Sequence, residues 1–136
     1  LPGHHVADMM RQSRLFCLAS HKEGTPVCVM EALSCGLPIV ATRVGGIPDI
    51  VVDQKTGILV EKGNAQELAD ALVSLLRDPS KCIRMGTEAQ MFAHAHLDIM
   101  RTADRLVDLY REIINVQLEQ RRSEPSAARS RVSSVI

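Results

Sequence analysis

The chain has 136 residues, of which 46% are hydrophobic and 24% are charged, a composition typical of a folded globular domain. Its 16 Lys and Arg residues balance its 16 Asp and Glu residues, so no net charge attracts nucleic acid. The aromatic side chains, Phe16, Phe92 and Tyr110, are too few to stack the bases of a single strand. The composition therefore excludes nucleic acid as a partner.

The length of the chain also limits which functions it can perform alone. A chain of 136 residues can bury a core, but it is short for a complete enzyme that binds two substrates. It begins at Leu1 without an initiator Met or a signal peptide, and no apolar run is long enough to span a membrane. We expect the sequence to be one module from the middle of a longer protein.

The spacing of cysteines and histidines predicts no metal site. Cys17, Cys28, Cys35 and Cys82 lack the close pairs that a zinc ribbon or a redox site needs. Cys28 and Cys35 would lie about 10 Å apart along one helix, which is too far for a disulfide. The two pairs of neighbouring histidines have no third ligand at a suitable spacing. We therefore expect free thiols in a reducing, cytoplasmic compartment.

Capping residues and apolar spacing predict alternating helices and strands. Thr25-Pro26 is typical of a helix start, because Thr is a good N-cap and Pro suits the first helical position. Gly36 and Pro38 favour the end of that helix. The expected elements are a helix over 6–13, a strand over 14–19, a helix over 25–35, a strand over 39–42, a helical turn at 48, a strand over 58–60, and helices after Asn64, after Asp78 and after Asp98. Such alternation with short connections implies an α/β fold, a parallel sheet covered by helices.

Apolar stripes on two of the later helices are interpreted as core faces. The stripes comprise Ala65, Leu68, Ala69, Leu72, Val73 and Leu76 on one helix, and Ile99, Ala103, Leu106, Val107, Tyr110, Ile113 and Ile114 on the last helix. Residues 1–122 are therefore predicted to form one domain. Residues 123–136 are rich in Ser, Ala and Arg, so we expect a disordered tail. Its Arg129 and Arg131 could touch a membrane surface or RNA weakly, although a solvated tail is the favoured interpretation.

The segment from Glu23 to Thr42 carries the candidate chemistry. A helix that starts near Thr25 presents unpaired N–H groups and a positive dipole end, which suit a phosphate or diphosphate. Gly24 lets the backbone approach such a ligand closely. Glu31 would lie about 9 Å into the helix and lean back toward its start, where two carboxylate oxygens suit the paired hydroxyls of a ribose. Glu23 would lie at the sugar end, where it could orient a sugar hydroxyl or stabilise positive charge that develops at the anomeric carbon.

Taken singly, each glutamate is explained by structure alone, because acids favour the first turns of a helix and are usually solvated in loops. The joint pattern is more specific. Glu23 and Glu31, with seven residues between them, resemble the E-x7-E motif of retaining GT-B glycosyltransferases of the group 1 family. The similarity extends over roughly residues 1 to 116. It includes Glu23-Gly24-Thr25-Pro26, Glu31-Ala32-Leu33, Gly36-Leu37-Pro38-Ile39-Val40-Ala41-Thr42, Gly45-Gly46-Ile47-Pro48-Asp49, Thr56-Gly57-Ile58-Leu59-Val60, Asp78-Pro79 and Arg84-Met85-Gly86.

The resemblance implies a Rossmann-like domain, the C-terminal half of a GT-B fold, that binds a nucleotide-diphosphate sugar. By the same resemblance, Glu31 would bind the ribose, and Glu23 would lie near the transferred sugar as the catalytic residue. The residues Gly24, Thr25, Pro26 and Val27 would meet the phosphates and the sugar. Transfer would retain the anomeric configuration, and it would need no metal or other cofactor.

Two departures from the family pattern are visible. Ala19 stands where relatives often have Pro, and Asp49 stands where many have Glu, so Asp49 is assigned no role. The family's diphosphate-binding Arg and Lys and its N-terminal acceptor domain would lie outside this chain. Lys22 and Arg43 are the cations near the motif, and both are interpreted as surface residues.

We expect the chain alone to be inactive and, because three strands make an incomplete sheet, to self-associate or to be marginally stable. Two alternatives stay open. One is a binding or regulatory module that keeps the fold without transferring a sugar. The other is a nucleotide-sugar epimerase, which can share the GT-B architecture but which the motif does not favour.

Overall fold

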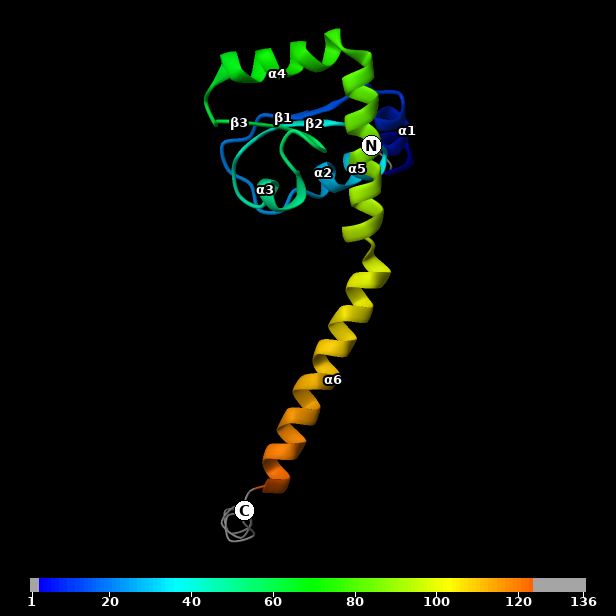
Figure 1. Cartoon of the computed structure of the whole chain (residues 1–136), viewed down its shortest axis with the longest axis vertical. Helices are drawn as coiled ribbons and strands as arrows, with labels where there is room; N and C mark the ends of the chain where they lie inside the picture. Colours follow the sequence, from blue (N-terminus) through cyan, green and yellow to red (C-terminus); the bar gives the residue numbers. More distant parts are fainter. Residues whose placement is uncertain (1–2, 124–136) are drawn as a thin grey trace. The chain divides into compact units, whose positions relative to one another are not determined.

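The computed structural model describes residues 3–123, which fall into two units, Leu1–Leu97 and Asp98–Ile136. Figure 1 labels the elements along the chain. The first unit contains α1 (Gly3–Arg11), β1 (Phe16–Leu18), α2 (Val27–Ser34), β2 (Ile39–Thr42), α3 (Ile47–Ile50), β3 (Gly57–Val60), α4 (Ala65–Arg77) and α5 (Pro79–His96). The described part of the second unit is α6 (Ile99–Ser123). None of the described helices is long and apolar enough to cross a membrane.

The three strands of the first unit form a parallel sheet in the order β1-β2-β3. Phe16 pairs with Ile39, and Val40 pairs with Ile58, so β2 is the central strand. Every residue of β2 and β3 is buried. The prediction of an α/β fold with a parallel sheet between helices is therefore confirmed.

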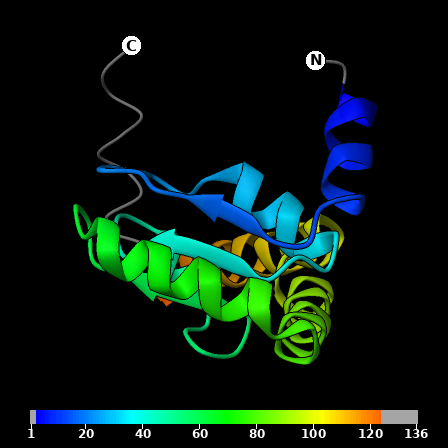
Figure 2. The same cartoon turned by 90° about the horizontal axis from the view of Figure 1, so that it is seen from above.

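Helices cover both faces of this sheet, with α2 and α3 on one side and α4 on the other (Figures 1 and 2). The side chains of β2 alternate between two core clusters, because successive strand residues point to opposite faces. Ile39 and Ala41 pack with α2 and α3, whereas Val40 packs with α4. A strand buried in this way reads as a continuous apolar run.

Most predicted boundaries of helices and strands agree with the structure, but the predicted start of α2, the helix of the candidate site, was wrong. Asn64 Oδ1 accepts a hydrogen bond from Glu67 N at 3.1 Å, and Asp78 Oδ1 accepts one from Lys81 N at 2.9 Å, as their capping patterns predicted. The helix expected to start at Thr25 begins instead at Val27, with Pro26 at the N-cap position. Thr25 is therefore no N-cap, because the chain stays extended one residue longer.

The second unit is a single helix in its described part. Its start is capped, since Asp98 Oδ1 accepts a hydrogen bond from Met100 N at 2.8 Å. Within the described residues of this unit, no second element is present against which the apolar stripe of α6 could pack. The first unit ends at Leu97, whereas the domain predicted over residues 1–122 would include most of α6. That domain boundary stays a prediction. So does the tail predicted over residues 123–136, which lies outside the described residues except for Ser123, the last residue of α6.

A close backbone contact joins α5 to the end of α2. A Cβ added at Gly86 of α5 would lie 2.3 Å from the carbonyl oxygen of Gly36. Gly36 has a φ of 75°, the left-handed conformation that commonly follows a helix end. Glycine at 86 therefore allows α5 to pack directly on this turn.

We predict that Gly86→Ala destabilises the protein, although alanine at an ordinary helix position stabilises by about 1 kcal/mol. The expected net loss is up to about 2 kcal/mol, because overpacking at a rigid contact costs about 1–3 kcal/mol and the gain in propensity offsets about 1 kcal/mol of that cost. Urea unfolding followed by circular dichroism measures the change. Thr87→Ala, at the exposed neighbouring position, is the control and should change stability little. Equal stability of the two variants would contradict the packing described here.

Candidate functional site

Two loops meet at the carboxyl edge of the sheet, where ligands bind in open parallel α/β folds. The β1–α2 loop spans residues 19–26 and carries Glu23. The β2–α3 loop spans residues 43–46 and follows the central strand. Their backbones are in direct contact, since Gly46 N donates a hydrogen bond to Gly24 O at 2.7 Å.

The amino end of α2 is open. No side chain caps it, and the nearest intrahelical bond runs from Val29 N to Pro26 O at 3.1 Å. The N–H groups of Val27 and Cys28 belong to the first turn, which has no acceptor inside a helix. Gly24 is exposed, and a Cβ there would meet no atom within 4 Å. An anion can therefore approach these amides along the backbone, and the helix dipole favours it.

The carboxylate of Glu23 is half-buried and held in place. Ser20 Oγ donates a hydrogen bond to Glu23 Oε1 at 2.5 Å. The carbonyl of Ser20 in turn accepts a bond from the buried Thr42 hydroxyl at 2.6 Å. Glu23 is thus linked through Ser20 to the last residue of the central strand, which gives its side chain a defined orientation. Sequence reasoning did not identify Ser20 and Thr42, because residues 22 positions apart carry no local signal of this contact.

Glu31 is exposed on α2 and lines a hollow of about 340 Å³ between α1 and α2. The remaining walls are mainly apolar and include Val6, Met10 and Met30. Glu31 and Glu23 share no hydrogen-bond partner among the residues that the structure describes. The two carboxylates are thus positioned by different contacts, one by a hydroxyl in a loop and the other by a helix face beside an apolar hollow.

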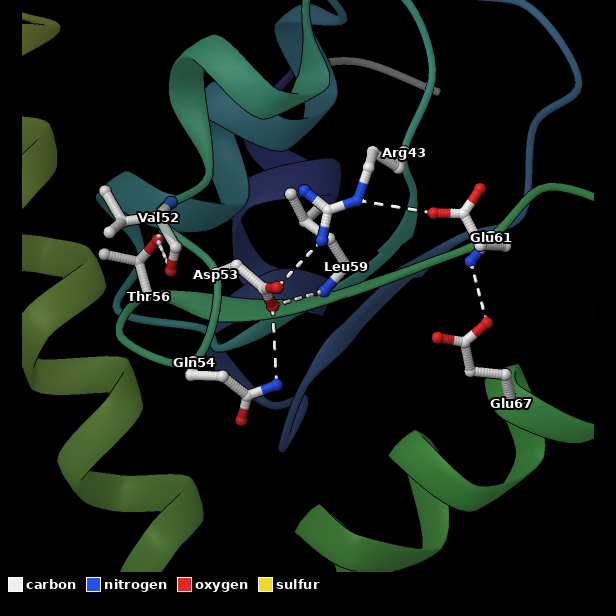
Figure 3. Close-up of polar contacts among 8 residues, drawn as sticks. All are labelled: Arg43, Val52, Asp53, Gln54, Thr56, Leu59, Glu61 and Glu67. Carbon is white, nitrogen blue, oxygen red and sulfur yellow. Dashed lines mark hydrogen bonds and ion pairs between the residues drawn. The ribbon is translucent and has the colours of Figure 1, made fainter.

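Arg43 forms ion pairs with two carboxylates, those of Asp53 and Glu61 (Figure 3). Its Nη2 lies 2.8 Å from Asp53 Oδ2, and its Nε lies 3.5 Å from Glu61 Oε1. Asp53 also accepts a hydrogen bond from Leu59 N at 2.9 Å. The Arg43 charge is therefore balanced within the β2–β3 region, in line with its interpretation as a surface residue. Lys22 is exposed as well.

The cysteines are free thiols, and Cys82 is buried. Within the part of the chain that the structure describes, no group of three or more His, Cys, Asp or Glu side chains is arranged to hold a metal ion.

A family model described as "Glycosyl transferases group 1" matches residues 1–92, which is more than half of the chain. The chain therefore belongs to the group 1 family of glycosyltransferases.

Named relatives agree with this assignment. The chain is 31% identical over 110 residues to the N-acetyl-alpha-D-glucosaminyl L-malate synthase of Bacillus anthracis, covering 81% of this chain and 29% of that protein. It is 34% identical over 110 residues to the D-inositol 3-phosphate glycosyltransferase of Saccharomonospora viridis, covering 81% of this chain and 25% of that protein. The chain thus spans less than a third of the length of these curated relatives.

The structure is similar to that of Anabaena Alr3699/HepE, solved in complex with UDP, with a TM-score of 0.73 and 26% identity. That match covers 76% of this chain and 29% of the Anabaena chain. The same protein has also been solved with UDP-glucose. The fold of the first unit is that of the GT-B glycosyltransferases.

We predict that Arg43 and Asp53 contribute unequally to stability. Arg43→Gln should lower the free energy of unfolding by less than about 1 kcal/mol, because partly exposed ion pairs are worth little. Asp53→Ala should cost about 1–3 kcal/mol, because it also leaves the buried Leu59 N–H without its acceptor. Urea denaturation of the two single variants and the double variant measures both effects. Equal losses from the two single variants would contradict this assignment.

Proposed function

We propose that this chain binds a nucleotide-diphosphate sugar as the donor part of a glycosyltransferase, and that the complete protein transfers the sugar to an acceptor with retention of anomeric configuration. The observation that carries the proposal is the open amino end of α2, with Glu23 on the loop before it and Glu31 within the same helix. Membership of the family supports it, as do the UDP and UDP-glucose complexes of the Anabaena protein.

The diphosphate would lie against the first turn of α2. The N–H groups of Val27 and Cys28 are available as donors there, and the partial positive charge of the helix end adds to their attraction for an anion. Pro26 contributes no N–H, while the exposed backbone of Gly24 leaves room for the ligand. Thr25 adjoins this turn through its backbone. A metal-free site of this kind would neutralise the leaving diphosphate with amides, the helix dipole and basic residues supplied from outside this chain.

The nucleoside would extend from the diphosphate toward Glu31. A carboxylate accepts two hydrogen bonds and suits the two hydroxyls of a ribose. The hollow beside Glu31 has apolar walls formed by α1 and α2, which would shield the flat face of a base from water. The sugar end of the ligand would then point toward Glu23.

Glu23 would act on the transferred sugar as the catalytic residue. Its carboxylate carries the charge that could stabilise a positive anomeric carbon, and the bond from Ser20 fixes its direction. The acceptor would be bound by a further domain, because the chain spans less than a third of its relatives. Closure of the two domains would bring donor and acceptor together, so the chain alone should be inactive.

We predict that Glu31→Gln weakens binding of the nucleotide. Titration calorimetry of this chain with UDP, GDP and ADP would find the base that is preferred. For that nucleotide, Glu31→Gln should lower affinity about tenfold or more, because a hydrogen bond to a charged group is worth about 1.5–3 kcal/mol. Glu88→Gln on α5, whose carboxylate lies 3.4 Å from Lys55 Nζ, is the control with the same chemical change and should leave affinity as it is. Equal affinities for the Glu31 variant and the unaltered chain would remove the ribose assignment.

We predict that Glu23→Gln in the complete protein lowers kcat by about 10²–10³, because a charge that stabilises the transition state is removed while the side-chain shape is kept. Product formation from a nucleotide-diphosphate sugar measures the rate, and NMR of the product gives its anomeric configuration. An inverted product would refute retention. Nucleotide binding without any transfer would indicate a binding module, and interconversion of the donor sugar without an acceptor would indicate an epimerase.

A further inference from the structure

The two loops at the carboxyl edge fit together through glycine. A Cβ added at Gly45 would lie 2.0 Å from the carbonyl oxygen of Glu23. A Cβ at Gly46 would lie 2.8 Å from Thr25 Oγ1 and 2.9 Å from Gly24 O. All three distances are shorter than a real Cβ contact, so a side chain at either position would force one of the two loops to shift.

The β2–α3 loop is itself tied to the core of the sheet. Arg43 N donates to Val60 O at 2.8 Å, which joins the start of the loop to β3. Ile47, the first residue of α3, is completely buried and donates from its N–H to Val44 O at 3.2 Å. The β2–α3 loop is therefore the fixed partner of the pair, and the β1–α2 loop rests on it.

The β1–α2 loop is held at two points, near its beginning and just past its middle. At the first point, the hydroxyl of Thr42, which is 4% exposed, bonds to the carbonyl of Ser20. At the second, Gly46 N bonds to the carbonyl of Gly24. Glu23 lies between these two bonds, and the open turn of α2 follows directly.

We propose that Thr42, Gly45 and Gly46 are positioning residues that hold the β1–α2 loop, and with it Glu23, in the geometry needed for transfer. This inference rests on the proposed function for its catalytic consequence. The mechanical part, that these residues immobilise the loop, stands on the contacts alone. None of the three touches the donor in this proposal, so they act through Glu23 and the amides of α2.

Substitutions at the two glycines distinguish the effect of backbone strain from the effect of a steric clash. Gly45 has a φ of 55°, in the left-handed region that disfavours other residues, so its replacement adds strain to the clash. Gly46 has a φ of −84° and a ψ of 6°, which any residue can adopt. Gly46→Ala therefore tests the steric clash without backbone strain. Gly36→Ala is the control that adds strain without a clash, because Gly36 has a φ of 75° and a Cβ there would lie 3.7 Å from its nearest atom, past the carboxyl end of α2.

Hydrogen exchange on the isolated chain tests the mechanical part. In Gly46→Ala, two amides should exchange about tenfold faster or more, after correction for global stability. They are the amide of residue 46, which donates to Gly24 O, and the amide of Val29, which donates to Pro26 O at the end of the loop. Thr42→Val keeps the side-chain shape, removes only the bond to Ser20, and should also accelerate exchange of these two amides. Gly36→Ala, although destabilised, should leave their exchange unchanged. If Gly46→Ala does not fold, Thr42→Val decides the matter by the same measurement.

Kinetics of the complete protein test the catalytic part. Displacement of a reacting group by about 1 Å can lower a rate about 10²-fold, so kcat should fall by about 10–10² in Gly46→Ala and in Thr42→Val. KM for the donor should rise by a smaller factor, because the first turn of α2 follows the loop, whereas Glu31 and its hollow are left in place. Gly36→Ala should keep the kcat of the unaltered protein.

The outcomes distinguish this inference from the proposed function. Unchanged loop exchange and unchanged kcat in folded Gly46→Ala and Thr42→Val would overturn the inference, as would an equal loss of kcat in Gly36→Ala. If the unaltered protein neither binds UDP, GDP or ADP nor transfers a sugar, the proposed function fails. Faster loop exchange in the two variants would still establish that these residues hold the loop.

Discussion

The burial of the central strand on both faces is the constraint on which the rest of this structure depends. The four residues of β2 lie between two layers of helices, and their side chains alternate between two core clusters. A parallel strand in this position has neighbours on both edges, so its ends are fixed by hydrogen bonds as well as by packing. The β2–α3 loop, which follows the carboxyl end of β2, therefore starts from a fixed position.

The candidate site depends on the rigid central strand indirectly, through the loop that carries Glu23. Glu23 is on a loop, and loops are usually the mobile parts of a domain. Here the loop is tied to the last residue of β2 and to the turn that follows it, by bonds of 2.6 Å and 2.7 Å. Rigid support of a functional side chain by contacts behind it is a general requirement for catalysis. The fold meets it with one hydroxyl and two glycines.

The amino end of α2 has no side-chain cap, in contrast to α4 and α5. Replacing a good N-cap costs a helix about 1 kcal/mol, and both α4 and α5 in this chain have side-chain caps. In α2, Pro26 holds the N-cap position without a side-chain bond to the first turn. In the proposed function this absence matters, because a side-chain cap would occupy the amides that are proposed to meet a diphosphate.

The sequence by itself determined the class of fold, the positions of β2, α4 and α5, and the membership of the glycosyltransferase family. Local sequence patterns predict these features: apolar runs, caps at Asn64 and Asp78, and the spacing of Glu23 and Glu31. Only the tertiary structure decided that Thr25 is not a cap, that Arg43 is engaged by Asp53 and Glu61, and that the first unit ends at Leu97. It also decided that Ser20, Thr42 and Gly46 hold the loop of Glu23. Apart from Ser20 and Glu23, which are three positions apart, these contacts join residues distant along the chain. Their partners are often backbone carbonyls, which every residue possesses and which a sequence pattern therefore cannot distinguish.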